Sequence, residues 1–589
     1  MIATTRFFTT AAIFSLLFGA ALAGAEEIVP LEKLDLTQMT AGFKQPQPNR
    51  EVTGRPLQIR GKRFKNGVGT HANSKFRVDL HKQAKRFTAT VGVDDTAKGN
   101  GSVEFLVLGD GRELWKSGVL TRKDGAKPVS VNLTGVGALE LRVTDARDGT
   151  SDDRADWADA KLALQDGARQ PEALPPHQTI ALRTKTFQMV FEVGDDDRLY
   201  QRVLGGPGEP KTKDHRRLEA YPQAGDGYMW EPALEVVHAD GNTSTHLVFE
   251  NATRTDQGSR GQVTRIQLQD SAYPLKVALC FRIFPDRDVI EQWSEIKNNE
   301  RKPVRLERMA STSLLLAPEH LTLTHFYGGW ANEMIPATEE LTDGIKIVDS
   351  KMGTRTAQDR SPSFILSLDG PPVETRGRVL AGSLAWSGNF QCAFERLGAE
   401  TRALCGVNPF ASSYDLDAGK TFTTPPIIWV WSNSGLGEMS RKLHSWARDF
   451  GVRDGHQPRA VLLNNWEATK FDFDFNRIAS LFHPAKQLGF ELFLLDDGWF
   501  GNKYPRVNDR AGLGDWQPNR ARLPGGLAPL AAAAEKDGLR FGIWIEPEMV
   551  NPKSDLYDRH PNWVIRQPKR DLDFQRNQLV LDLTRPAVQ

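Results

Sequence analysis

Residues 490–499 read Phe490-Glu-Leu-Phe-Leu-Leu-Asp496-Asp497-Gly498-Trp499. The six residues before Asp496 are largely apolar, which predicts a strand buried on both faces. Two adjacent carboxylates, a glycine and a tryptophan follow this strand directly. In parallel α/β folds, ligands bind at the carboxyl ends of the strands. The segment therefore predicts a parallel sheet with a ligand site at the tip of this strand.

The chemistry of this tip suits a sugar. Two acids at the end of a buried strand cost desolvation free energy and repel each other unless a polar group binds them. The carboxylates of Asp496 and Asp497 can accept hydrogen bonds from hydroxyl groups, and the indole of Trp499 can stack on a pyranose ring. The alternative interpretation is an Asp-Asp-Gly turn whose acids cap a helix.

The sequence around this segment alternates strand and helix patterns from Gly435 onward, which predicts βα units and a parallel sheet. Pro484 is expected to kink or shorten its helix. Only three or four units fit after residue 460, whereas a (β/α)₈ barrel needs eight strands. We therefore expect a piece of a longer protein, the alternative being a small open sheet; its open edge would make the isolated piece poorly soluble. The expected strands are 460–466, 490–495, 541–546 and 578–583, and the expected helices are 439–450, 475–488 and 527–535.

The residues before this region read as β structure. Residues 30–165 contain short apolar runs separated by Gly, Asp and Asn turns, which predicts a β-sandwich or jelly-roll module. Residues 170–176 hold three prolines and read as a linker. Residues 177–430 predict a second, larger two-sheet sandwich. The fold class is thus multidomain β plus α/β, with the partial α/β domain over 435–589.

Composition excludes some classes of partner. Lys and Arg number 75 and Asp and Glu 74, so the net charge of +1 gives no reason to expect nucleic acid or a membrane surface. The 14 tryptophans among 589 residues favour carbohydrate surfaces or a large β-rich core. Three cysteines form neither a disulfide framework nor a zinc site. Cys392 and Cys405 could pair across a hairpin, or stay as thiols.

Residues 1–25 resemble a secretory signal peptide. Arg6 precedes an apolar run from Phe7 to Leu22, which is short for a membrane span. The small residues there predict cleavage near Ala23 or Ala25 and a secreted or periplasmic protein. The alternative is an uncleaved anchor. No other stretch is long enough to span a membrane.

Residues after 460 resemble glycoside hydrolase family 36, the bacterial α-galactosidases or melibiases. The sandwich at 177–430 is similar to the family's N-terminal domain through Ala385–Phe390 and Gly406–Phe410. Residues 30–165 resemble the NPCBM class of carbohydrate-binding modules through Asn66–Ala72 and Ala155–Ala160. The segments that carry the main resemblance are Leu463-Asn-Asn-Trp-Glu-Ala-Thr469, Phe471–Phe473, Leu494-Leu-Asp-Asp-Gly-Trp-Phe500, Leu513-Gly-Asp-Trp516, Phe541-Gly-Ile-Trp-Ile-Glu-Pro-Glu-Met-Val550, Asp555–Tyr557, His560-Pro-Asn-Trp-Val564 and Arg576-Asn-Gln-Leu-Val-Leu-Asp-Leu583.

The resemblance implies retaining hydrolysis of terminal α-galactosides on a (β/α)₈ barrel, without cofactor or metal. Retention needs two carboxyl groups about 5 Å apart, one nucleophile and one acid/base. In the family, the nucleophile lies in a Lys-Trp-Asp-Met-Asn segment, which this sequence does not contain. Both catalytic carboxylates are therefore expected beyond Gln589, and this polypeptide alone is expected to be inactive.

The resemblance also implies substrate-binding residues. Asp496 and Asp497 would bind sugar hydroxyls, including the axial one of galactose. Trp544, inside the third strand, would form a sugar platform or fill the core. Arg576 would hydrogen-bond the substrate or form a salt bridge with Asp571 or Asp573. Trp466 would end the first strand and face the pocket or pack; Trp330 would wall the entrance. Glu546 and Glu548 fit a supporting hydrogen-bonded role.

The sequence leaves two classes of function open. The first is an exported α-galactosidase-type glycosidase whose N-terminal module tethers it to glycans. The second is a non-catalytic carbohydrate-binding protein. An α-N-acetylgalactosaminidase or a galactosyl transferase on the same scaffold is a third option, and a homo-oligomer is compatible with all of them. The acids Asp152, Asp153, Asp156 and Asp159 could bind Ca²⁺, but a solvated loop is the favoured interpretation.

Overall fold

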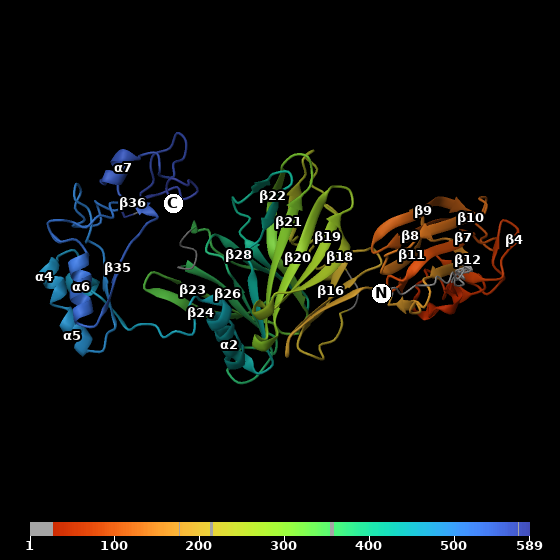
Figure 1. Cartoon of the computed structure of the whole chain (residues 1–589), viewed down its shortest axis with the longest axis horizontal. Helices are drawn as coiled ribbons and strands as arrows, with labels where there is room; N and C mark the ends of the chain where they lie inside the picture. Colours follow the sequence, from red (N-terminus) through yellow and green to blue (C-terminus); the bar gives the residue numbers. More distant parts are fainter. Residues whose placement is uncertain (1–26, 100, 176, 213–215, 354–358, 575) are drawn as a thin grey trace, which may run out of the picture. The chain divides into compact units, whose positions relative to one another are not determined.

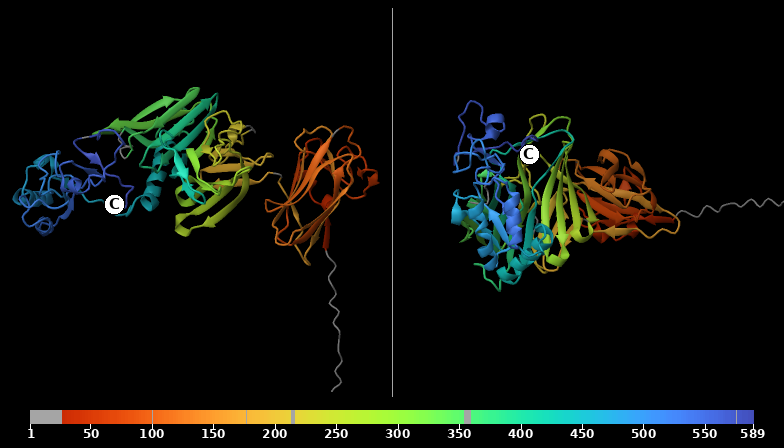
Figure 2. Two further views of the ribbon diagram at one scale, coloured as in Figure 1. Left: turned by 90° about the horizontal axis from the view of Figure 1, so that it is seen from above. Right: turned by 60° about the vertical axis from the view of Figure 1, so that its left-hand side comes forward.

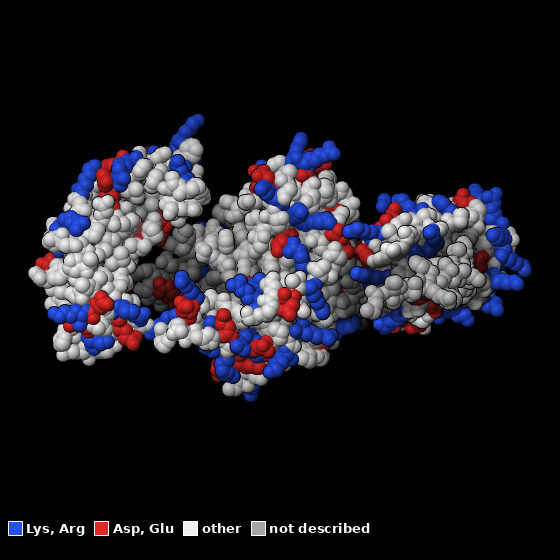
Figure 3. All heavy atoms as spheres, viewed as in Figure 1, with Lys and Arg blue, Asp and Glu red and all other residues white. Residues whose placement is uncertain are grey.

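The computed structural model describes residues 27–99, 101–175, 177–212, 216–353, 359–574 and 576–589. The expected signal peptide at 1–25 lies outside these ranges. The chain divides between Arg453 and Asp454 into two compact units. No helix within the described ranges combines the length and apolar character needed to cross a membrane. Figure 3 shows Lys and Arg side chains among Asp and Glu side chains on the face drawn.

The amino-terminal module is a β-sandwich of two antiparallel sheets, drawn red to orange in Figure 1. The alternation expected from the sequence is observed in β8, where Val103, Phe105 and Val107 are buried. Trp157 lies in the core and meets Phe87 and Phe105 edge-on. One sheet runs β10 (Lys127–Asn132), β7 (Ala84–Val93), β12 (Arg154–Leu164), β5 (Gly67–His71) and β2 (Gln47–Pro48), with β1 (Glu27–Pro30) on β12; the other runs β13 (Glu172–Leu174), β6 (Ser74–Asp79), β11 (Ala138–Thr144), β8 (Ser102–Gly109) and β9 (Arg112–Thr121).

The segment expected to be a linker is partly a strand. β13 pairs with β6 through Glu172 and Asp79 and through Leu174 and Arg77. Pro171 and Pro175 flank this strand rather than interrupt it, so no ladder hydrogen bond is lost to proline. The prediction of a linker over 170–176 is therefore wrong for its middle residues.

The second domain is a large antiparallel sandwich, as the sequence predicts (yellow to green in Figure 1). Its core is continuous and includes the fully buried Trp429 and Trp431. A ten-stranded sheet runs β18 (Leu247–Asp256), β19 (Gln262–Asp270), β20 (Leu275–Phe284), β21 (Val289–Asn298), β32 (Ile427–Ser432), β27 (Val379–Leu384), β26 (Arg360–Ser367), β23 (Thr322–Gly329) and β24 (Asn332–Glu340), with β31 (Thr421–Thr423) on β21. A six-stranded sheet runs β17 (Leu234–Val237), β22 (Val304–Leu316), β29 (Glu400–Val407), β28 (Phe390–Leu397) and β25 (Gly344–Asp349), with β30 (Tyr414–Leu416) on β22, and a three-stranded sheet runs β14 (Thr179–Arg183), β15 (Gln188–Val193) and β16 (Leu199–Gly205).

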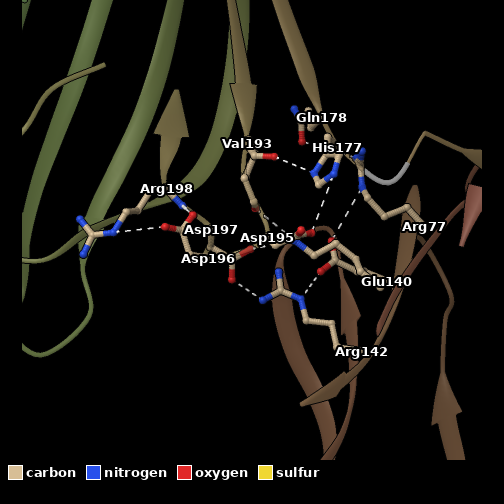
Figure 4. Close-up of polar contacts among 12 residues, drawn as sticks. Arg77, Glu140, Arg142, His177, Gln178, Val193, Asp195, Asp196, Asp197 and Arg198 are labelled. Carbon is tan, nitrogen blue, oxygen red and sulfur yellow. Dashed lines mark hydrogen bonds and ion pairs between the residues drawn. The ribbon is translucent and has the colours of Figure 1, made fainter. Parts of the chain in front are cut away.

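Charged residues of the module contact the loop between β15 and β16 (Figure 4). Lys75 Nζ lies 3.2 Å from Asp197 Oδ1, and Arg142 Nη1 also binds Asp197. Arg77 donates to the backbone oxygen of Pro175 at 3.3 Å and to Gln178 Oε1 at 3.5 Å. One carboxylate of the larger sandwich therefore accepts from two cations of the module.

Helix α2 (Gly435–Trp446) follows the last strand of the larger sandwich. It starts four residues earlier than expected, and Met439 packs on the outer face of β27 and β32 with Leu443 and Trp446 beside it. These residues form the apolar stripe that the sequence predicts. A single π turn over Ala447–Gly451 ends the helix.

The second compact unit contains the expected parallel sheet (blue in Figures 1 and 2). Its strands are β33 (Leu462–Asn464), β34 (Leu492–Leu495) and β35 (Arg540–Ile543), all parallel and shorter than expected. Within β34, Phe493 and Leu495 are buried, but Leu492 and Leu494 are half-buried. The expectation of burial on both faces is therefore wrong, because only one face packs on helices in the described residues.

The helix expected over 475–488 is two helices, α4 (Phe475–Ala479) and α5 (Phe482–Gln487). Pro484 lies inside α5, where its ring would clash with the carbonyl of Ser480 if the helix continued. The break before α5 removes that clash, and the expectation that Pro484 shortens its helix is confirmed. Helix α6 (Ala528–Lys536) lies close to its expected place.

The strand expected at 578–583 does not extend the parallel sheet. Its central residues form β37 (Leu579–Val580), which pairs antiparallel with β36 (Met549–Val550). Val550, Val564 and Leu579 form a small separate core, so their burial does not require the main sheet. The expectation of a fourth parallel strand is wrong for the described residues.

Candidate functional site

Three strands of the parallel sheet end at the same edge. The register pairs Asn464 with Leu494, and Leu495 with Ile543. The next residues stay close: the Asp496 amide donates to Asn465 Oδ1 at 2.7 Å, and the Trp544 amide donates to the Leu495 carbonyl at 2.8 Å. This edge therefore holds three predicted site residues, Trp466, Asp496 and Trp544.

Asp496 keeps spare acceptor capacity at this edge. Its Oδ2 accepts from Asn464 Nδ2, and its Oδ1 accepts from the Asp497 amide at 2.6 Å. The side chain is half-buried. An ionised carboxylate offers about four acceptor positions, so Asp496 can accept further hydrogen bonds from a ligand.

Asp497 is held by an arginine that the sequence did not point to. Arg506 binds both of its oxygens, with Nε 2.9 Å from Oδ1 and Nη2 2.7 Å from Oδ2. The residues are 5% and 0% exposed. Asn551 accepts from Arg506 Nη1 at 3.0 Å, and the ring of Phe500 lies 5.9 Å from the guanidinium. Arg506 therefore provides the polar partner that the buried carboxylate of Asp497 requires.

Trp499 is a core residue rather than a sugar-stacking surface. It is 2% exposed and packs on Phe500 and Trp516. Its indole Nε1 donates to the Trp544 carbonyl at 3.0 Å, which satisfies its one donor. The expectation that Trp499 offers an aromatic plate beside the acid pair is wrong, because the turn at Gly498 directs it inward.

Trp544 lies just beyond β35 rather than inside it. It is half-buried, and its ring centroid is 6.5 Å from that of Phe500 and 6.3 Å from that of Trp516. The expectation of a strand over 541–546 is wrong at this end, since β35 stops at Ile543. Trp544 therefore lies at the strand edge without being fully buried.

The carboxyl of Glu546 lies within electrostatic reach of Arg576 and Asp497. Burial raises the pKa of the Glu546 carboxyl above its usual value; Arg576 opposes this rise, and Glu548 adds to it. Arg506 and Asp497 act on the same carboxyl, with smaller effects. Gln578 Nε2 donates to Glu546 Oε2 at 3.4 Å, which fits the supporting role predicted for it.

The remaining predicted residues are more exposed. Arg576 is exposed, with a backbone φ of 52°, and no ion pair joins it to Asp571 or Asp573 among the residues described. Trp466 begins the short helix α3 (Trp466–Thr469) instead of ending a strand, and meets Phe471 edge-on at 5.0 Å. Trp330 lies between β23 and β24 in the other compact unit and is 86% exposed.

No cluster of three or more His, Cys, Asp or Glu side chains suited to a metal ion exists in the part of the chain that the structure describes. The acids of the amino-terminal module that were expected in a solvated loop differ in burial. Asp159 is exposed, but Asp153 and Asp156 are fully buried, and neither carboxylate oxygen of Asp156 has a hydrogen-bond partner. The expectation of a solvated acidic loop is wrong for these two residues.

Comparison with known families gives three matches. The Glycosyl hydrolase family 36 N-terminal domain matches residues 183–417, and the Melibiase family matches residues 421–589. The NPCBM/NEW2 domain matches residues 27–163. Together the matches cover both sandwiches and the parallel sheet.

Curated relatives are named α-galactosidases. Alpha-galactosidase C of Emericella nidulans is 35% identical over 396 residues, which cover 63% of this chain and 52% of that protein. Alpha-galactosidase AgaA of Geobacillus stearothermophilus is 34% identical over 389 residues, covering 63% and 52%. The chain therefore spans about half the length of these relatives.

Solved structures agree with the sequence matches. The crystal structure of AgaA from Geobacillus stearothermophilus has a TM-score of 0.66 at 30% identity, over 70% of this chain and 62% of that one. The galactosidase domain of the α-galactosidase-sucrose kinase AgaSK has a TM-score of 0.65 at 31% identity, over 70% and 62%. A variant of AgaA, with a TM-score of 0.65 at 29% identity over 70% and 62%, was solved in complex with raffinose.

Proposed function

Since the chain belongs to glycoside hydrolase family 36, we propose that it supplies the galactose-binding part of an α-galactosidase acting on terminal α-galactosides. The observation that carries this proposal is the edge at which the three parallel strands end. Asp496 retains acceptor capacity there, and Trp544 follows the neighbouring strand. The complex of a related α-galactosidase with raffinose, an α-galactoside, supports the same class of substrate.

Each residue has a distinct proposed role. Asp496 accepts hydrogen bonds from ring hydroxyls, and Asp497, fixed by Arg506, presents a charge whose position does not vary. A charged acceptor discriminates strongly between sugars that do and do not place a hydroxyl there. Trp544, half-buried just beyond the neighbouring strand, contributes its indole to the sugar ring, and the exposed Arg576 donates to hydroxyls.

The reacting carboxylates are proposed to lie outside residues 1–589. The sequence holds no Lys-Trp-Asp-Met-Asn segment, in which the family carries its nucleophile. Without a nucleophile, the positioning and electrostatic contributions have no covalent partner on which to act. The 589-residue polypeptide is therefore proposed to bind galactosides without hydrolysing them.

The same observation favours a second candidate, a non-catalytic carbohydrate-binding protein. In both cases the polypeptide is exported, and the NPCBM-type module tethers it to glycans. The candidates differ in the DNA downstream of codon 589 of the gene. A continuation with a Lys-Trp-Asp-Met-Asn-like segment supports the enzyme, and a stop codon supports the binding protein.

An assay of two polypeptides tests the proposal. The 589-residue chain and a chain continued through the downstream codons are each incubated with nitrophenyl α-galactoside. We expect nitrophenol release from the longer chain alone, with retention of configuration at the anomeric carbon. Turnover by the 589-residue chain would place the nucleophile within it and contradict the assignment of the catalytic carboxylates.

A further inference from the structure

Two cysteines of the larger sandwich face each other across neighbouring strands. Cys392 in β28 is the direct register partner of Cys405 in β29. Both side chains are 1% exposed, so they share one buried position in the sheet. The third cysteine, Cys280, lies in β20 of the other sheet and faces Arg265 and Glu295.

The hairpin turn fixes the kind of pair that these cysteines form. Leu397 and Glu400 flank a two-residue loop formed by Gly398 and Ala399. Gly398 has a positive φ of 59° and Ala399 does not have a positive φ, which is the combination that a type II′ turn requires. In such a hairpin the flanking pair exchanges backbone hydrogen bonds, and hydrogen-bonded and non-hydrogen-bonded pairs then alternate. Cys392 lies five residues before Leu397, which makes its pair with Cys405 non-hydrogen-bonded.

A backbone hydrogen bond further along the two strands confirms this count. The Asn408 amide donates to the Asn389 carbonyl at 3.0 Å, eight residues from the turn on each strand, where the alternation requires a bonded pair. No register shift interrupts β28 and β29. Non-hydrogen-bonded pairs have Cα atoms about 4.5 Å apart with their side chains close together. Disulfides span about 4.4–6.8 Å between Cα atoms.

Cys392 also affects the pKa of the Cys405 thiol. Burial raises the pKa of the Cys405 thiol well above its usual value, and hydrogen bonding and charge interaction with Cys392 raise it further. A buried thiol with a raised pKa is a poor nucleophile in the folded protein. Both cysteines are buried thiols in this structure, so an oxidant reaches them most readily before the sheets pack together, and burial would then shield the bond from reductants.

We propose that Cys392 and Cys405 form a cross-strand disulfide during oxidative folding of the larger sandwich, while Cys280 remains a thiol. The oxidant is a small-molecule or protein disulfide. One cysteine thiolate attacks it and releases the oxidant's first thiol; the second cysteine thiolate then resolves the mixed disulfide and releases the second. Two electrons pass to the oxidant, and the two cysteine protons end on its released thiols.

Thiol counting on the full chain tests the proposal. The protein is secreted into a bacterial periplasm, purified, denatured without reductant and alkylated, and its intact mass is compared with that of a sample reduced first. We expect one alkylated thiol before reduction and three after. Peptide mapping without reduction should join the peptides that contain Cys392 and Cys405.

Single variants serve as matched controls. Cys280→Ser should show no alkylated thiol before reduction and two after, whereas Cys392→Ser should show two in both samples. Three alkylated wild-type thiols before reduction would overturn the proposal, as would any disulfide that contains Cys280 or joins two chains. The wild-type result decides the question even if a variant does not fold.

Discussion

The guanidinium of Arg506 binds both carboxylate oxygens of Asp497. The exposed fraction of each residue is 5% or less. Paired charges of this kind cost desolvation free energy that only good geometry and further hydrogen bonds recover. Asn551 supplies one such bond to the arginine. Asp497 at the tip of β34 is therefore oriented by residues of the chain itself.

Removing the arginine should destabilise the second compact unit. Arg506→Met leaves a buried carboxylate without its partner, which costs about 3–5 kcal/mol of unfolding free energy. Denaturant unfolding followed by tryptophan fluorescence measures this loss. Arg510→Met, on an exposed arginine of the same loop, is the matched control and should change stability little. Equal losses in the two variants would show that the ion pair contributes nothing specific.

Asp156 should make the amino-terminal module less stable as pH rises. Burial raises the pKa of its carboxyl well above the usual value, and the neighbouring Asp94 and Glu51 add to the rise. Because the folded state binds the proton more tightly than the unfolded state, the stability gained below pH 4 is lost progressively toward neutral pH. Asp156→Asn removes this dependence.

Calorimetry of the full chain between pH 4 and 8 measures the effect. The melting temperature of the Asp156→Asn variant should exceed that of the wild type by about 4 °C or more at pH 8, and the two should converge at pH 4. Asp159→Asn, an exposed residue of the same strand, should follow the wild type at every pH. A constant difference across the range would mean that Asp156 does not titrate as described.

Trp544, half-buried just beyond β35, should contribute its indole to galactose binding. Trp544→Leu should raise the Kd for galactose about tenfold, which corresponds to about 1.4 kcal/mol. Trp563→Leu removes an indole that stacks on His560 and should leave the Kd unchanged. Equilibrium dialysis with labelled galactose gives both constants. If the two variants bind alike, Trp544 is a packing residue only.

The sequence predicted the elements whose pattern is local. Alternation in β8, the apolar stripe of α2 and the parallel order of the second unit's strands all follow from residue spacing. The break before α5 follows from Pro484, whose ring acts within four residues. These features depend on neighbours along the chain, so they can be derived without knowing the fold.

Features that depend on distant partners were missed. The need for a cation beside Asp497 was predictable from burial, but no pattern distinguishes Arg506 from the other arginines of the loop after β34. Trp499 is directed into the core by the turn at Gly498, and its N–H donates to the carbonyl of Trp544, just beyond the neighbouring strand. Leu579 and Val580 pair with β36 instead of the main sheet because a second small core covers them.

The central claim is that the acid pair binds galactose, and calorimetric titration of the 589-residue chain with galactose and glucose tests it most directly. We predict saturable galactose binding that Asp496→Asn weakens at least tenfold, about 1.4 kcal/mol, together with loss of preference over glucose. Glu535→Gln, on an exposed acid of α6, should bind like the wild type. Unchanged galactose affinity in Asp496→Asn, or no binding by the wild type, would contradict the claim and leave the two aspartates as a turn.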